Sequence, residues 1–172
     1  MRAMYYESFK QMKKHLGQLD KWLVAAAAHA EAKKFDSKQF LSLRLVVDQF
    51  AFVRQVQIAC DTVKLGAARL TGKEAETHAD NEETLDQLRA RVSSVIGYLD
   101  GLTAKDFEGA ATLTITQPRW EGKTMTGADY FLEHVQPNFF FHFTTVYALL
   151  RQHGVAIGKR DYLGALTQSA PR

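Results

Sequence analysis

The chain has 172 residues and a formal net charge of +3, with 46% hydrophobic and 24% charged residues. This composition is typical of one globular domain, expected here over residues 1–172, and it excludes disorder over the whole chain. The positive charges are scattered rather than gathered into a basic stripe, which argues against a nucleic-acid-binding protein.

The cysteine content and the hydropathy indicate the cellular compartment of the protein. Cys60 is the only cysteine, so an intrachain disulfide is excluded, and this suits a reducing compartment. We expect Cys60 to be a buried hydrophobe, with a reactive thiol as the alternative. No run reaches about 18 apolar residues, and the N-terminus does not read as a signal peptide. We therefore expect a cytoplasmic protein that does not enter a membrane.

The first predicted helix runs from about Tyr5 to Lys33. Its apolar residues recur every three or four positions, which places them on one stripe that packs against neighbours at shallow angles. His15 and His29 are not part of this stripe, and we expect both on the surface. The stripe consists of Tyr5, Phe9, Met12, Leu16, Leu19, Leu23 and Ala26.

The second predicted helix runs from about Lys38 to Leu70, with Asp36 or Ser37 as its N-cap, and it stops near Gly72. Its apolar residues cover more than one face, so we expect it at the centre of a bundle.

A narrow polar stripe follows this helix through Arg44, Asp48, Gln55 and Thr62. Residues four and seven apart share a helix face, so Arg44 and Asp48 could pair along the helix. Two interpretations stay open: a solvated edge with one weak ion pair, or a polar lining inside the bundle.

Residues 71–81 are polar and without period, and they predict a loop. A third helix is then expected, started by Asp80 together with Glu83 and carried to Leu102 by leucines and valines at three- and four-residue spacing. The pattern Thr103-Ala-Lys-Asp106 is a capping box that can open one further helical turn.

The period then changes to two. Residues 112–116 alternate polar and apolar side chains, and residues 123–126 supply a returning strand, so we expect a small β-hairpin. Two strands alone are marginally stable, so we expect this hairpin to pack against the helices through Leu113, Ile115 and Trp120.

A fourth helix begins with the capping box Thr126-Gly-Ala-Asp129, runs through Arg151 and ends at Gly154. Pro137 lies inside it, where it removes a hydrogen bond and should kink the helix.

Asn138 and His142 lie one turn apart on this fourth helix, within an otherwise apolar and aromatic surface. The simplest interpretation is a buried neutral histidine bonded to a polar neighbour. The alternative is a functional site in the core of the bundle. A single histidine does not make a metal site, because zinc takes three or four protein ligands.

Five blocks of sequence together carry a resemblance to a known family. They are Met4-Tyr-Tyr, Arg54 to Asp61, Asp106-Phe-Glu-Gly109, Pro137 to His142, and Lys159 to Gly164. Together they resemble a bacterial domain-of-unknown-function family in the DinB-like (YfiT-like) superfamily, which is regarded as a superfamily of metalloenzymes. The resemblance implies an all-α fold: a DinB-like up-down-down-up four-helix bundle, here with the small hairpin between helices three and four. It also implies a homodimer.

The resemblance further implies where a divalent metal would bind. The superfamily's site takes one histidine from the second helix and two from a His-x-x-x-His pair in the fourth. His142 lies nine residues before Arg151 and matches the second histidine of the pair, whereas Asn138 replaces the first. The second helix has no histidine, so Asp48 or Gln55 would have to stand in. His142 is thus the one implied metal ligand, and whether any metal cofactor binds stays open.

Three hypotheses for the function remain. The first is an enzyme that acts on a small molecule, in which His142 is general base or metal ligand, Asp48 is its partner, and Asn138, Gln55 and Arg44 bind substrate. It predicts a polar pocket between the second and fourth helices. The second is a non-catalytic small-molecule-binding bundle that has lost the metal site. The third is a structural protein that dimerises through aromatic helix surface, and it predicts no cavity.

Overall fold

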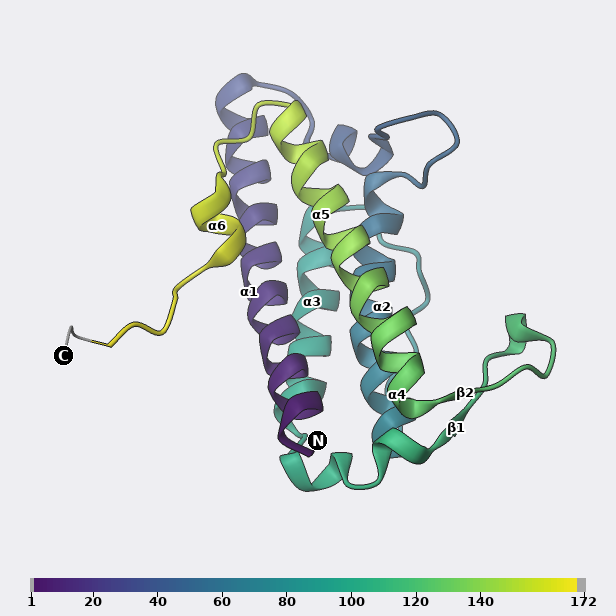
Figure 1. Ribbon diagram of the computed structural model, residues 1–172. Coiled ribbons are helices and arrows are strands. Elements are labelled where there is room, and N and C mark those ends of the chain that lie inside the picture. The colour runs from purple at the N-terminus through teal and green to yellow at the C-terminus, as the bar shows by residue number, and fades with distance from the viewer. Residues whose placement is uncertain (1, 170–172) are drawn as a thin grey trace.

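The computed structural model describes residues 2–169, with side chains from residue 4 onward. Within this range four long helical segments run side by side (Figure 1). They are α1 (Arg2–Lys33), α2 (Phe52–Thr71), α3 (Leu85–Asp100) and a last segment composed of α4 (Gly127–Asp129), a π-helical turn (Tyr130–Val135) and α5 (Gln136–Gln152). In the view of Figure 1, α1 and α5 run upward and α2 and α3 run downward. The predicted up-down-down-up bundle is therefore confirmed.

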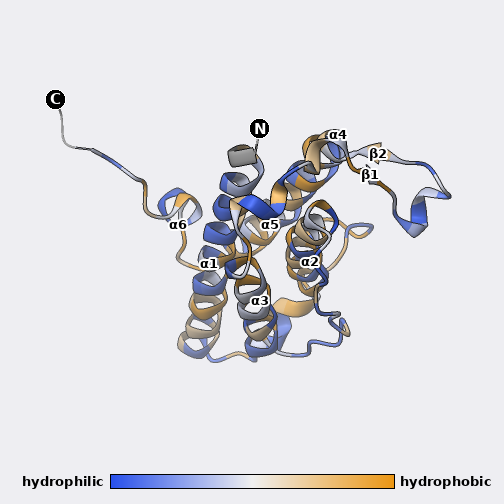
Figure 2. Cartoon of the chain, turned by 90° about the horizontal axis from the view of Figure 1, so that it is seen from below, coloured by the Kyte–Doolittle hydropathy of each residue, from blue (hydrophilic) through white to orange (hydrophobic). Residues whose placement is uncertain are grey.

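The helices enclose one hydrophobic core. The predicted stripe of α1, from Tyr5 to Ala26, is buried, and α1 packs chiefly on α3 while α2 packs chiefly on α5. Seen from below, the hairpin and the C-terminal segment reach outward from this bundle (Figure 2). Cys60 is fully buried, as predicted, and burial raises the pKa of its thiol to about 12. No helix of residues 2–169 combines the length and the apolar character that a bilayer span requires.

The expected start of the second helix is wrong. A 3-10 helix spans Ser37–Ser42 after the N-cap Asp36, and residues 43–51 form an irregular loop before α2 begins at Phe52. The Phe52 amide closes this loop by donating to the Leu43 carbonyl at 2.8 Å. Local apolar density predicted a helix here, but the loop leaves four of its apolar side chains exposed. These are Leu45, Val46, Val47 and Phe50, with exposed fractions of 41%, 57%, 94% and 56%.

The surface position expected for His15 is also wrong, because the ring is only 4% exposed. Its plane lies at 90° to the rings of Phe140 and Phe143, at centroid distances of 5.3 and 5.0 Å. Tyr162 of α6 (Lys159–Leu163) covers it further. These aromatic residues lie more than 120 positions away in the sequence, so the period of α1 alone could not reveal the cover. His29 is half-buried.

The connection between α2 and α3 must cross the length of the bundle because the two helices are parallel. Residues 72–84 make this crossing without helix, and Thr84 caps α3 by accepting from the Gln87 amide. Arg91 of α3 holds the crossing in place: its guanidinium pairs with Asp80 at 2.7 Å and with Glu82 at 2.8 Å. It also pairs with Asp61 of α2 at 2.7 Å.

The capping box predicted at Thr103 is present and opens a 3-10 turn over Ala104–Phe107. The predicted hairpin is present but shorter than expected: β1 (Thr114–Ile115) pairs antiparallel with β2 (Met125–Thr126). Ile115 and Trp120 meet the bundle as expected, whereas Leu113 is 40% exposed.

The last helical segment begins as predicted, with the Thr126 hydroxyl accepting from the Asp129 amide at 3.1 Å. The π-helical turn Tyr130–Val135 ends two residues before Pro137. Proline has no amide N–H to donate, and its ring displaces the carbonyl group of the preceding turn. A widened turn accommodates both effects. The segment ends beside Gly154, whose φ of 84° lies in the left-handed region that glycine favours.

Candidate functional site

A groove of about 550 Å³ lies between α2 and the last helical segment, and the hairpin closes one end of it. On α2 its lining residues recur with helical spacing from Arg54 through Ile58, Thr62 and Leu65 to Arg69. The opposite wall is formed by every fourth residue of the last segment: Tyr130, His134, Asn138 and His142. Gln117, Pro118 and Arg119 of the hairpin contribute the closed end.

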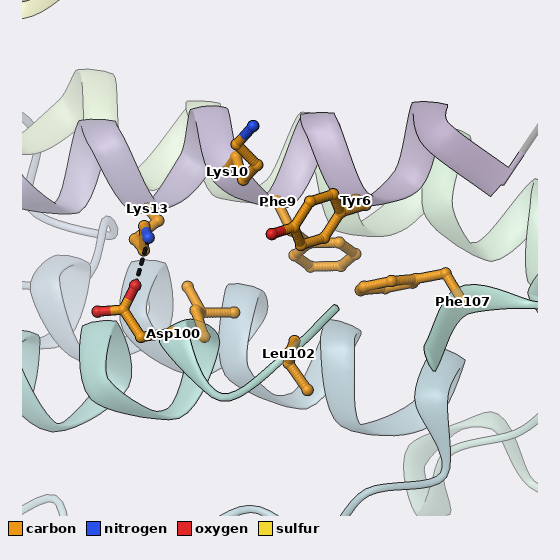
Figure 3. A pocket seen from close by; sticks show the side chains of 8 residues that line it. Tyr6, Phe9, Lys10, Lys13, Asp100, Leu102 and Phe107 are labelled. Carbon is orange, nitrogen blue, oxygen red and sulfur yellow. Dashed lines mark hydrogen bonds and ion pairs between the residues drawn. The ribbon is translucent and has the colours of Figure 1, made fainter. Parts of the chain in front are cut away.

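Another cavity of the described chain is much smaller, at about 40 Å³, and lies between α1 and residues 99–107. Figure 3 shows that aromatic rings line it, with Phe9 and Phe107 stacked at a centroid distance of 5.2 Å. Lys13 and Asp100 form an ion pair at its edge. This volume holds one or two water molecules rather than an organic ligand, so we place no site there.

His142 is 7% exposed and has one defined hydrogen-bond partner. Its Nδ1 lies 2.6 Å from Oε1 of Gln55, and Nε2 of Gln55 donates to the Phe50 carbonyl at 2.9 Å. Because the amide oxygen of Gln55 can only accept, the network assigns the proton to Nδ1 of His142. The lone pair of the ring is therefore on Nε2, for which no protein partner is found among the described residues.

The environment keeps this ring neutral. Burial, and to a lesser extent the nearby positive charge of Arg54, lower the pKa of His142 to about 4 from the usual 6.5. The ring is therefore an uncharged hydrogen-bonding group throughout the neutral range.

We expect His142 to make the protein less stable as the pH falls. The unfolded chain binds a proton near pH 6.5 and the folded chain only near pH 4, so acid favours the unfolded chain in between. From pH 7 to pH 5 this coupling should remove about 2 kcal/mol from the free energy of unfolding. Urea denaturation at the two pH values measures it. His142→Gln serves as the comparison, because the other histidines titrate in both proteins. Equal losses in the two proteins would contradict the assignment.

Asn138 makes the second cross-helix bond of the groove. Its Nδ2 donates to Oγ1 of Thr62 at 2.7 Å, which leaves Oδ1 of the amide as an acceptor. Thr62 lies two turns after Gln55 on α2, and Asn138 lies one turn before His142 on the antiparallel last segment. The two cross-helix hydrogen bonds therefore follow one another along the groove. For Gln55 and Thr62 the predicted polar stripe is thus a lining inside the bundle.

Arg44 and Asp48 do not join this site. Both are exposed in the loop 43–51, and the Arg44 guanidinium donates to the Gln49 carbonyl rather than pairing with Asp48. The expected pairing of Asp48 with His142 is wrong, because α2 begins at Phe52 and does not carry position 48 onto the groove face. Gln55 occupies that place.

Several groove residues were missed by the sequence analysis. Arg69 continues the seven-residue spacing of Gln55 and Thr62, and His134 continues the four-residue spacing of Asn138 and His142. Both could have been found by extending these two patterns. Arg119 could not, because the hairpin that carries it approaches the groove only in three dimensions.

The three-histidine metal site implied by the resemblance does not fit these residues. Among residues 2–169, no group of three or more His, Cys, Asp or Glu side chains is placed to hold a metal ion. His142 is the one imidazole where the pattern requires three, and amides such as Asn138 and Gln55 are weak ligands for transition metals. Arg54 adds positive charge beside the ring. We therefore derive no chemistry through a metal.

Comparison with known proteins agrees with this architecture. A family model described as a domain of unknown function, DUF1993, matches residues 4–163. The crystal structure of a DinB family member protein from Shewanella denitrificans is 49% identical in sequence and superposes with a TM-score of 0.95. The match covers 99% of this chain and 97% of that one. No curated protein matches.

Proposed function

This chain belongs to the DUF1993 family of DinB-like bundle proteins, and we propose that it binds a small organic molecule in the groove between α2 and α5 without a resident metal. The volume of about 550 Å³ suits such a ligand.

The observation that carries the proposal is the hydrogen bond between His142 and Gln55. It fixes the tautomer of the ring and leaves Nε2 as an acceptor, one helical turn from the acceptor Oδ1 of Asn138. Two buried or half-buried acceptors on the wall of an open groove suit a ligand that presents hydroxyl, amine or amide N–H donors. Ile58 and Leu65 on the facing helix supply apolar contact.

The same geometry favours binding over acid–base catalysis. A general base works best when its pKa lies near the working pH, and the pKa of His142 lies near 4. Among the described residues no carboxylate orients the ring, because Gln55 occupies that position. A purely structural role is also less well supported, since it predicts that the polar residues satisfy one another with no cavity.

Metal content tests one half of the proposal. Protein without a His tag is loaded with zinc, nickel or manganese and dialysed, and bound metal is measured by mass spectrometry for the natural chain and for His142→Ala. We expect no stoichiometric metal in either protein. One tightly bound ion per chain that disappears in His142→Ala would overturn the metal-free proposal.

Ligand binding tests the other half. Small polyols, primary amines and primary amides are titrated at millimolar concentration into ¹⁵N-labelled protein and followed by NMR. We expect at least one of these classes to shift the amide signals of Ile58, Asn138 and His142, and His142→Phe to abolish the shifts. His153→Phe is the matched control, because His153 is exposed at the end of α5. Failure of all three classes to shift these signals would count against the proposal.

A further inference from the structure

The hairpin end of the groove has a different character from the His142 end. Here four side chains converge from three elements: Arg69 from α2, Gln117 and Arg119 from the hairpin, and His134 from the π-helical turn. All four carry N–H donors, whereas the His142 end presents the acceptors Nε2 of His142 and Oδ1 of Asn138 beside Arg54, which is already paired with Asp80.

The two arginines are not neutralised by carboxylates. Among the described residues, Arg69 donates to the Tyr130 hydroxyl at 2.9 Å, and Arg119 donates to Nε2 of His134. Neither makes an ion pair within residues 4–169. The carboxylate of Asp61 also borders the groove, but it is held by Arg91 at 2.7 Å and Lys64 at 3.1 Å. The hairpin end therefore carries uncompensated positive charge.

Two further donors are buried without any partner. Because Nε2 of His134 accepts from Arg119, the proton of the neutral ring lies on Nδ1, and this buried atom has no hydrogen-bond partner among the described residues. Nε2 of Gln117 is likewise buried and unpartnered, on a side chain that is only 9% exposed. A buried donor without an acceptor costs about 1–3 kcal/mol, so native structures rarely keep two of them in one groove without use.

The charges around His134 agree with this protonation. Burial, and then the positive charges of Arg119 and Arg69, lower its pKa, so the ring remains a neutral donor at Nδ1.

From this arrangement we infer that the hairpin end of the groove is an oxyanion subsite, which receives a carboxylate or phosphate group of the bound molecule. An arginine guanidinium presents its N–H groups as a fork that matches both groups. Within the described part of the chain, Gln117 Nε2 and His134 Nδ1 are further unpaired donors on residues that line this end.

This inference rests on the proposed function and narrows its ligand class. His134 and His142 are eight residues apart, roughly 12 Å along a helix axis. A ligand that meets both ends therefore carries an anionic group at one end and a hydroxyl, amine or amide donor about two helical turns away.

The probes for the test are inorganic phosphate and propionate, each titrated at low ionic strength against sodium chloride as a control. Binding is measured by calorimetry and by NMR shifts of Arg69, Gln117 and His134. We expect one or both probes to bind, and the double substitution Arg69→Met/Arg119→Met to weaken the binding at least about tenfold, the effect of losing a charge-assisted hydrogen bond. Gln117→Leu keeps both arginines and should weaken binding severalfold. Arg160→Met, on the exposed face of α6, is the matched control and should bind as the natural chain does.

The outcomes separate this inference from the proposed function. A response to phosphate alone assigns a phosphate, and a response to propionate alone assigns a carboxylate. No response to either, or equal binding by the double variant, overturns the subsite. Neutral probes that bind at His142 without any anion response leave the proposed function standing and remove the subsite. Anion binding that depends on Arg69 and Arg119, without any binding of a neutral probe, leaves the subsite standing and overturns the proposed binding at His142.

Discussion

Replacing Arg91 by methionine is expected to lower the free energy of unfolding by about 3–5 kcal/mol. The Arg91 side chain is 2% exposed and pairs with Asp61, Asp80 and Glu82 at 2.7 to 2.8 Å. Methionine fills a similar volume but leaves these carboxylates without their shared cation. Asp61 and Asp80 can recover some hydration because they are 26% and 36% exposed, whereas Glu82 is only 9% exposed. Most of the loss should therefore come from the charge left buried at Glu82.

Urea denaturation of the variant measures this loss, with Arg89→Met as the matched control on the same helix. Arg89 pairs with Asp20 at 2.8 Å but is 39% exposed, so its removal should cost less than about 1 kcal/mol. Hydrogen exchange gives a second readout, because Arg91 anchors the crossing segment 72–84. Amides of that segment should exchange faster in Arg91→Met than in Arg89→Met. If the two variants unfold at the same urea concentration, the network does not stabilise the fold as argued.

The Arg91 network also bears on the groove, because Asp61 borders the groove and Asp80 pairs with a groove residue. Asp80 accepts from Arg54, which lines the groove beside His142, as well as from Arg91. Gln57 of α2 donates to Glu82 at 2.7 Å. The crossing segment thus fixes the outer side of α2, while Asn138 and His142 fix its inner side. We expect ligand probes to bind more weakly to Arg91→Met than to Arg89→Met for this reason.

The features that the sequence could predict are those determined locally. The capping box at Thr103 and the N-cap hydrogen bond of Thr126 are both present, because a segment of only four residues defines each. The buried stripe of α1 follows directly from a spacing of three and four. The start of the second helix could not be predicted, because Val46 and Val47 have the apolar character of a buried helix while the structure leaves them exposed. The predicted exposure of His15 was wrong for the opposite reason, since aromatic side chains distant in sequence cover it.

The same distinction between local and long-range features applies to the candidate site. Asn138 and His142 could be selected from the sequence, because polar side chains one turn apart in an aromatic helix need partners. Their partners required the register between two helices, which spacing within one helix does not define. Asp48 was therefore expected as the partner of His142 and Gln55 as a substrate-binding residue, whereas Gln55 is the partner and Asp48 lies outside the helix. The oxyanion subsite needed still more, since its donors come from three elements that meet only in the folded chain.

Substituting Gly127 by alanine is expected to cost about 3 kcal/mol or more, because no space exists for a side chain there. A Cβ at this position would lie 1.8 Å from the Ala110 carbonyl oxygen, a backbone atom that no rotamer change can move. The Gly127 amide also donates to the Leu113 carbonyl at 2.8 Å, so relieving the clash breaks a hydrogen bond worth about 1 kcal/mol. Overpacking itself adds about 1–3 kcal/mol.

Thermal and urea denaturation of Gly127→Ala measure this cost, and Gly17→Ala is the matched control. Gly17 lies inside α1, and a Cβ there would meet no heavy atom of a neighbouring element within 4 Å, so alanine should stabilise the protein by about 0.5–1 kcal/mol. Gly127 begins the segment that carries Tyr130 and His134 to the groove, so its displacement should also weaken phosphate or propionate binding. A Gly127→Ala protein that melts with the natural chain would mean that α4 does not pack against residues 110–113 in solution. The hairpin end of the groove would then lack the rigid support that an oxyanion subsite requires.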